Sequence, residues 1–297
     1  MQHFWDTVDT IPAGMGFSYF HPFHLCWLGG IALAIFALCR LYRQSDADRR
    51  QRIRRCLALL TVADELFKDA GLLIGGNFDP SYLPLHLCSI NIFLIALHAW
   101  KPSKLLENFL YSFCIVPAAA ALLFPVTWSS LPGANFMVIH SFTVHGLLLC
   151  YPILLLSAGE LRRDWRYFPR CFLLLAGFAA VAVAANAVFD TNFMFLSRAT
   201  EGNPLYLFQA LLGNHLWGYP ILMVPLFLVL YGPSSCGNGG KSTRKRQCVK
   251  KGETMLPPFC RSSFCSFTLA CSSPSAGTRA ASSSPPLYRP SRPSSGA

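Results

Sequence analysis

The feature that most constrains this chain is a series of seven long apolar stretches separated by short polar segments. A helix that spans a lipid bilayer needs about 20 mainly apolar residues, and each stretch has about that length. We therefore predict an all-α, polytopic membrane protein with a seven-helix transmembrane bundle. The predicted spans are residues 24–42, 56–78, 82–100, 106–126, 135–157, 171–189 and 207–231.

The composition agrees with a membrane protein. Charged residues make up only 13% of the 297 residues, whereas soluble domains average about 25%, and so little charge cannot cover a water-soluble surface. The net charge is +11, but the basic residues lie between and after the apolar stretches and are not interleaved with aromatic residues. We therefore expect membrane lipids as partners and no nucleic acid.

The basic residues also predict an orientation. They gather in the first, third and fifth loops and after the last span, whereas the even-numbered loops contain only Arg198. Because cytoplasmic loops are enriched in Lys and Arg, we predict a non-cytoplasmic N-terminus and a cytoplasmic C-terminal tail. We place the protein in a cell inner membrane. The first ten residues carry acids and no Lys or Arg, so we expect no cleaved signal peptide.

The last part of the chain differs in character from the rest. Residues 233–297 are rich in Ser, Pro, Gly, Arg and Cys, and they lack the apolar periodicity that a packed core needs. We predict a transmembrane domain over residues 1–232 and a disordered, basic tail over residues 233–297.

Four ionisable residues lie inside the second predicted span: Asp64, Glu65, Lys68 and Asp69. Charges at this depth are costly and usually face a bundle interior or a water-filled cavity. Their helical spacing lets Lys68 pair with Asp64 or with Glu65 along one face. Two interpretations stay open: the group is an internal ion-pair lock between helices, or one carboxylate lines a functional pocket.

Further polar residues gather in the non-cytoplasmic half of the predicted bundle. The interpretation for each is either a site residue or a side chain that hydrogen-bonds between helices. No close cluster of histidines and carboxylates lies on one helix, so we expect neither a metal nor another cofactor. These residues are His86, Cys88, Asn91, His140, His145, Asn214 and His215.

Cys88 and His145 give the sharpest chemical hypothesis. A thiolate is a strong nucleophile, and a nearby imidazole can accept its proton. Acyl transfer through a thioester also needs a hydrogen-bond donor for the oxyanion, which Ser89, Asn91 or Asn214 can supply. The alternative is that the thiol and the imidazole have no chemical role and are packed separately in the core.

Three sequence runs resemble known membrane proteins: LPLHLCSINIFL at 83–94, ALLFPV at 121–126 and NFMFL at 192–196. They look like bacterial YwaF-type integral membrane proteins and, more distantly, the animal transmembrane protein 164 family. The resemblance covers residues 15–232.

In the animal family, a Cys follows a Pro on the third helix, and a His lies seven residues before the Pro of a later span. Cys88 matches that Cys, and His145 matches that His, seven residues before Pro152. The resemblance implies transfer of acyl chains onto lysophospholipids or between phospholipids, with the Cys as nucleophile. The neighbouring residues depart from the pattern, because Leu87 replaces the Pro and Ser89 replaces a His.

The leading functional prediction is a lipid-directed acyl transferase or hydrolase that acts on a phospholipid or acyl substrate. Cys88 is the predicted nucleophile and His145 the base, with His86 as a neighbouring polarising group. Two alternatives remain: a transporter or small-ligand receptor that uses the charges of the second span, and a non-catalytic membrane protein.

Overall fold

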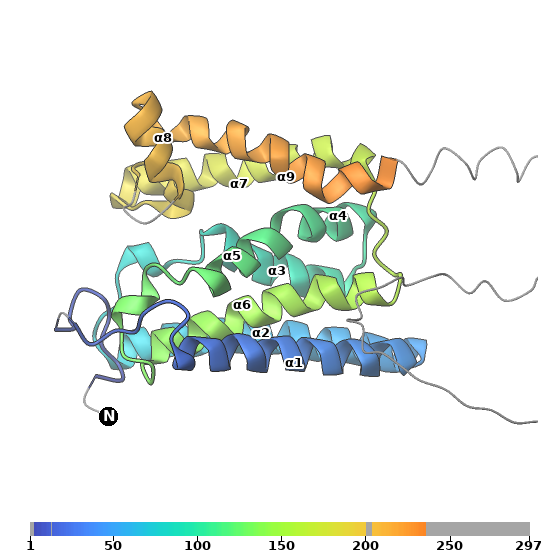
Figure 1. Ribbon diagram of the computed structural model, residues 1–297, viewed down its shortest axis with the longest axis horizontal. Coiled ribbons are helices and arrows are strands. Elements are labelled where there is room, and N and C mark those ends of the chain that lie inside the picture. Colours follow the sequence, from blue (N-terminus) through green and yellow to red (C-terminus); the bar gives the residue numbers. More distant parts are fainter. Residues whose placement is uncertain (1–2, 13, 200–203, 236–297) are drawn as a thin grey trace, which may run out of the picture. The chain divides into compact units, whose positions relative to one another are not determined.

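The computed structural model describes residues 3–12, 14–199 and 204–235, which Figure 1 draws in colour. The chain divides into two compact units, Met1–Arg246 and Gln247–Ala297, and the described residues all belong to the first. These residues are all-α, as predicted. The tail predicted beyond residue 232 lies almost entirely outside them. The α-helices are α1 (Pro22–Gln44), α2 (Ala47–Ile74), α3 (Leu87–Trp100), α4 (Lys104–Phe113), α5 (Ile115–Leu123), α6 (Phe136–Ser157), α7 (Phe168–Phe189), α8 (Pro204–Leu212) and α9 (Gly218–Ser235).

The described residues contain five helical stretches that are long and apolar enough to cross a membrane. The chain is therefore a multi-pass membrane protein, whereas the full count of seven spans stays a prediction. α2 has the length for a span but carries many charges, and α3 is apolar but has only 14 residues. The five stretches are Pro22–Gln44, Lys104–Ser130, Phe136–Ser157, Trp165–Phe189 and His215–Gly232.

Two predicted spans are not continuous helices. In the fourth, α4 and α5 meet at Cys114, where the backbone departs from regular helical geometry before Pro117. In the seventh, α8 and α9 are separated by a turn that contains Gly213, whose φ is +70°. A left-handed backbone conformation ends a helix and favours glycine. Hydropathy alone does not register either interruption.

α6 is the helix around which the bundle is arranged. It packs against α1, α2, α3 and α5, and α1, α2 and α6 lie side by side in Figure 1. Fourteen of its 22 residues are buried. Leu148 of α6 belongs to the main apolar core together with Ile95 of α3 and Phe109 of α4. This central position brings the polar side chains of α6 against those of α2 and α3.

The N-terminal segment closes one end of the bundle. The side-chain amide of Asn135 donates hydrogen bonds to the carbonyls of His3 and Asp6, both at 2.9 Å. The rings of Phe4 and Trp5 pack against Phe136 at the start of α6. This segment therefore covers the end of the bundle where α2 finishes and α6 begins.

Candidate functional site

The charged residues of α2 form an ion-pair network inside the bundle. Lys68 Nζ lies 2.6 Å from Glu65 Oε1 and 3.2 Å from Asp69 Oδ1, and it also donates a hydrogen bond to the carbonyl of Tyr82 at 2.9 Å. Glu65 and Lys68 are each only 5% exposed. The prediction that Lys68 pairs with Glu65 is confirmed. No Lys68–Asp64 pair forms among the described residues.

Asp64 instead faces α6, because its carboxylate meets a histidine of that helix. His140 Nδ1 donates a hydrogen bond to the Asp64 backbone carbonyl at 3.2 Å, and it lies 2.9 Å from Asp64 Oδ2 as an ion-pair contact without hydrogen-bond geometry. The other ring nitrogen, Nε2, is 3.8 Å from Glu65 Oε2. His140 therefore bridges two carboxylates of α2.

Cys88 is the second residue of α3, because the helix begins at Leu87 and not at residue 82, where the predicted span begins. His86 is the N-cap residue, and its side chain makes no capping hydrogen bond. The first backbone N–H groups of a helix have no partner within the helix. They also carry the positive end of the helix dipole. Cys88 therefore belongs to the turn of α3 whose backbone N–H groups have no acceptor within the helix.

His145 lies in the middle of α6 and has a defined ring orientation. Its Nδ1 is 2.7 Å from the backbone carbonyl of Ser141, which can only accept a hydrogen bond. Nδ1 therefore carries the proton, and in the neutral ring Nε2 keeps its lone pair. This is the tautomer in which Nε2 is able to act as a base.

Cys88 and His145 each lie near one of the charged or polar side chains of α2 and α6. Glu65 is within electrostatic range of Cys88, and His140 is within that range of His145, while Glu65 and His140 lie 3.8 Å apart. Among the described residues, no hydrogen bond joins the Cys88 thiol to the His145 ring, which bonds to Ser141. We call the following side chains the polar cluster: Asp64, Glu65, Lys68, His86, Cys88, His140 and His145. Both Cys88 and His145 keep part of their surface exposed.

The loop after α7 covers His86, and the sequence analysis missed its role. Met194 N donates a hydrogen bond to His86 Nδ1 at 3.3 Å. Met194 and Phe195 have φ values of +54° and +55°, which L-amino acids other than Asn and Asp rarely adopt. Asn186 holds this loop through hydrogen bonds with Phe193 and Thr191. Strained backbone of this kind clusters at functional sites.

The remaining predicted residues have partners of their own. Asn91 donates one N–H of its side-chain amide to the carbonyl of Phe113; the amide carries a second N–H, so its role as an oxyanion donor stays a prediction. Asn214 is exposed and accepts a hydrogen bond from the backbone N–H of Leu216. His215 lies in the short turn before α9, at the start of the candidate span His215–Gly232, and its Nε2 donates to the carbonyl of Phe195.

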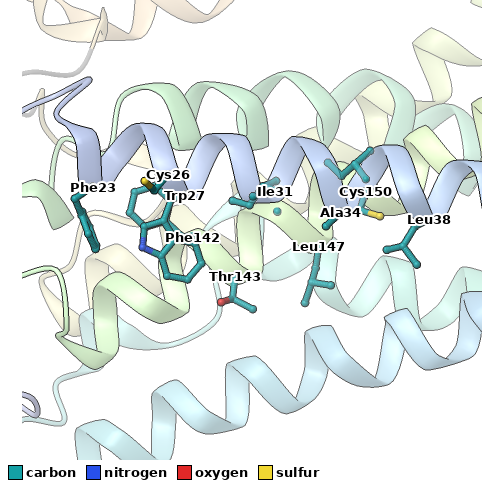
Figure 2. A pocket seen from close by; sticks show the side chains of 13 residues that line it. Phe23, Cys26, Trp27, Ile31, Ala34, Leu38, Phe142, Thr143, Leu147 and Cys150 are labelled. Atoms are coloured by element: carbon teal, nitrogen blue, oxygen red, sulfur yellow. The ribbon is translucent and has the colours of Figure 1, made fainter.

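An apolar groove runs between α1 and α6, as Figure 2 shows, with a volume of about 500 Å³. The rings of Trp27 and Phe142 stack at one end with centroids 5.1 Å apart. Gly146 keeps the two helices close, because a Cβ atom there would lie 3.3 Å from Ile31. Neither Cys88 nor His145 lines this groove. Among the described residues, no group of three metal-ligating side chains is arranged to hold an ion.

A comparison with protein families places residues 17–231 in a model described as the TMEM164 family. This match confirms the resemblance to the animal transmembrane protein 164 family, whereas the resemblance to bacterial YwaF-type proteins stays a prediction. Comparisons with curated proteins and with solved structures give no significant match.

Proposed function

Since the chain belongs to the TMEM164 family, we propose that it is a lipid-directed acyl transferase or hydrolase with Cys88 as nucleophile and His145 as base. The observation that carries this proposal is the placement of the Cys88 thiol in the first turn of α3, within electrostatic range of Glu65, which itself lies 3.8 Å from His140 on the helix of His145. The Ser141 contact supports it, because it leaves Nε2 of His145 as the basic nitrogen.

The first half-reaction takes the acyl group from a phospholipid. The Cys88 thiol gives its proton to Nε2 of His145 as sulfur attacks the ester carbonyl. The N–H groups in the first turn of α3 stabilise the oxyanion. The ester C–O bond then breaks, and the leaving oxygen takes the proton from the imidazolium. The products are a lysophospholipid and an acyl thioester on Cys88.

The second half-reaction returns the enzyme to its starting state. A hydroxyl group of a lysophospholipid, or water, gives its proton to Nε2 as its oxygen attacks the thioester. The C–S bond breaks, and the thiolate recovers the proton from His145. A lysophospholipid acceptor makes the protein a transferase, and water makes it a hydrolase. His86, held beside the loop after α7, borders the same end of α3.

The experiment is phospholipid remodelling by purified protein reconstituted in vesicles. We expect Cys88→Ala and Cys88→Ser to abolish acyl exchange while the protein still inserts and folds. Cys171→Ala is the matched control, because this buried thiol lies at the start of α7. Acyl exchange at the wild-type rate in Cys88→Ala would show that the assignment is wrong.

A second candidate function is transport or small-ligand reception by the charges of α2. The favouring observation is the continuous series of contacts from Lys68 through Glu65 to His140 and Asp64, which resembles a proton or ion relay. Glu65→Gln separates the two proposals. We expect this variant to abolish proton or ion transport if α2 is a relay. Acyl transfer by Cys88 should continue at a reduced rate.

The location is also part of the proposal. We place the protein in a cell inner membrane, with a non-cytoplasmic N-terminus and a cytoplasmic tail, as in a YwaF-type protein. In this orientation the polar cluster faces the outer leaflet. Acyl chains then reach the thiol laterally from the bilayer.

A further inference from the structure

A second group of ionisable side chains lies at the other end of α3 from the polar cluster. His98 is ten residues after Cys88, which corresponds to about 15 Å along a helix. The C-terminal ends of α1 and α6 and the start of α2 lie at one common end of the bundle (Figure 1). The proposed function uses none of these side chains.

Glu160, just after α6, is the only carboxylate that the described contacts bring into this group. Its Oε2 accepts hydrogen bonds from the Tyr42 hydroxyl and from Arg54, both at 2.7 Å. Its Oε1 lies 3.2 Å from Arg50 Nη1. Arg55 follows Arg54, and its guanidinium stacks over the ring of Trp100 at 5.8 Å. Three guanidinium groups against one carboxylate leave a net charge of +2.

Three buried side-chain nitrogens of this group lack a hydrogen-bond partner within the part of the chain that the structure describes. Among the described residues, five buried side-chain polar atoms lack a hydrogen-bond partner, and three belong here: Arg54 Nε, Arg55 Nε and His98 Nε2. His98 is only 3% exposed, and Arg54 interacts with it electrostatically. Two of these atoms, Arg54 Nε and Arg55 Nε, carry an N–H, and buried donors without an acceptor are costly and uncommon. Their concentration beside an excess of positive charge indicates a missing anionic acceptor.

We propose that Arg54, Arg55 and His98 form a binding site for a phosphate group. A guanidinium presents its N–H groups in a planar fork that matches the oxygens of a phosphate. The side chain of Arg54 is 16% exposed, so a rotation of the arginine side chains brings Nε to a ligand that arrives from the bundle end. The site lies at the end of the spans, where lipid phosphates are found.

The phosphate group that binds here has two sources: the headgroup of an anionic phospholipid, and free phosphate in solution. The test uses the full chain in phosphatidylcholine nanodiscs. One arm adds inorganic phosphate to the solution, and the other includes phosphatidic acid in the disc. Binding is measured by calorimetry in the first arm and by native mass spectrometry in the second.

The variant is Arg54→Lys/Arg55→Lys, which keeps both charges and the Glu160 ion pair but removes both Nε donors. We expect its affinity for phosphate or phosphatidic acid to fall about tenfold, which corresponds to about 1.4 kcal/mol. Arg52→Lys, at an exposed position of the same helix turn, keeps the wild-type affinity. Arg55→Lys alone repeats the test with a smaller loss if the double variant does not fold.

Binding that occurs only in the lipid arm assigns the site to a headgroup. Binding that occurs only in the solution arm assigns it to a soluble phosphate. The proposal is overturned if wild-type protein binds neither probe. It is equally overturned if Arg54→Lys/Arg55→Lys binds as tightly as wild type, or if Arg52→Lys loses as much affinity. These readouts are independent of acyl transfer, so failure here leaves the assignment of Cys88 intact.

Discussion

His140 Nδ1 in α6 lies 2.9 Å from the Oδ2 atom of Asp64 in α2, and both side chains are about one-tenth exposed. Replacing His140 by leucine leaves the carboxylate in the bundle without this partner. Breaking a buried pair on one side typically costs about 3–5 kcal/mol. We expect His140→Leu to lower the unfolding free energy by that order, measured by denaturation in detergent micelles.

The double variant Asp64→Leu/His140→Leu is the control for this contact. Replacing both members of a buried pair by apolar residues is often neutral or stabilising, so the double variant should recover most of the lost stability. If His140→Leu is as stable as wild type, the contact is not a lock between α2 and α6. A relay role for these groups then gains support.

Asn186→Ala tests whether the loop after α7 is held in its unusual conformation. Asn186 Oδ1 accepts hydrogen bonds from Phe193 N at 2.6 Å and from Thr191 Oγ1 at 3.0 Å. Residues with positive φ cost about 1–3 kcal/mol each and persist only when their surroundings hold them. We therefore expect faster hydrogen exchange at Met194 and Phe195, measured by mass spectrometry, and slower acyl transfer.

Val188→Ala is the control for this loop, because that side chain is 74% exposed and lies on the same helix. It should leave hydrogen exchange in the loop unchanged. Unaltered exchange in Asn186→Ala would mean that the loop keeps its conformation without these hydrogen bonds.

Single-cysteine labelling tests the orientation and whether α2 spans the membrane. Arg49 lies in the first turn of α2, and Asp79 lies just after its end, both exposed. In a background with all twelve native cysteines changed to alanine, we expect an impermeant maleimide to label Asp79→Cys in intact cells. Arg49→Cys should react only after the cells are opened. Equal labelling of both positions in intact cells would contradict a spanning α2.

The sequence predicted helices best where apolar pattern and capping coincide. The span predicted over residues 135–157 matches α6 to within one residue, because Asn135 is an N-cap whose side chain accepts from Met137 N. The second span begins nine residues earlier than predicted, since Asp46 caps α2 and its first turns are basic. Counting apolar residues finds the part of a helix that fits the bilayer and misses its polar extension.

The candidate site was predictable only as a list of residue types. The helical spacing allowed Lys68 to pair with Asp64 or with Glu65. In the structure Lys68 pairs with Glu65, whereas Asp64 contacts His140 on another helix. Contacts between helices depend on how the helices rotate and pack, which local spacing does not determine. The positive φ of Met194 has no signal in the sequence either, since methionine is not a residue that favours it.

Gly71→Ala tests the close packing that holds the N-terminal segment on the bundle. A Cβ atom at Gly71 would lie 2.4 Å from the ring of Phe136 and 3.1 Å from that of Trp5. Phe136 is fully buried, so it cannot move aside without displacing its neighbours. Such overpacking typically costs about 1–3 kcal/mol, and we expect a loss of that size in thermal unfolding. Gly177→Ala in α7 is the matched control, because nothing lies within 4 Å of its added Cβ, and it should be neutral or slightly stabilising. Equal melting temperatures for the two variants would mean that Trp5 and Phe136 repack freely, and that the N-terminal segment is only loosely held.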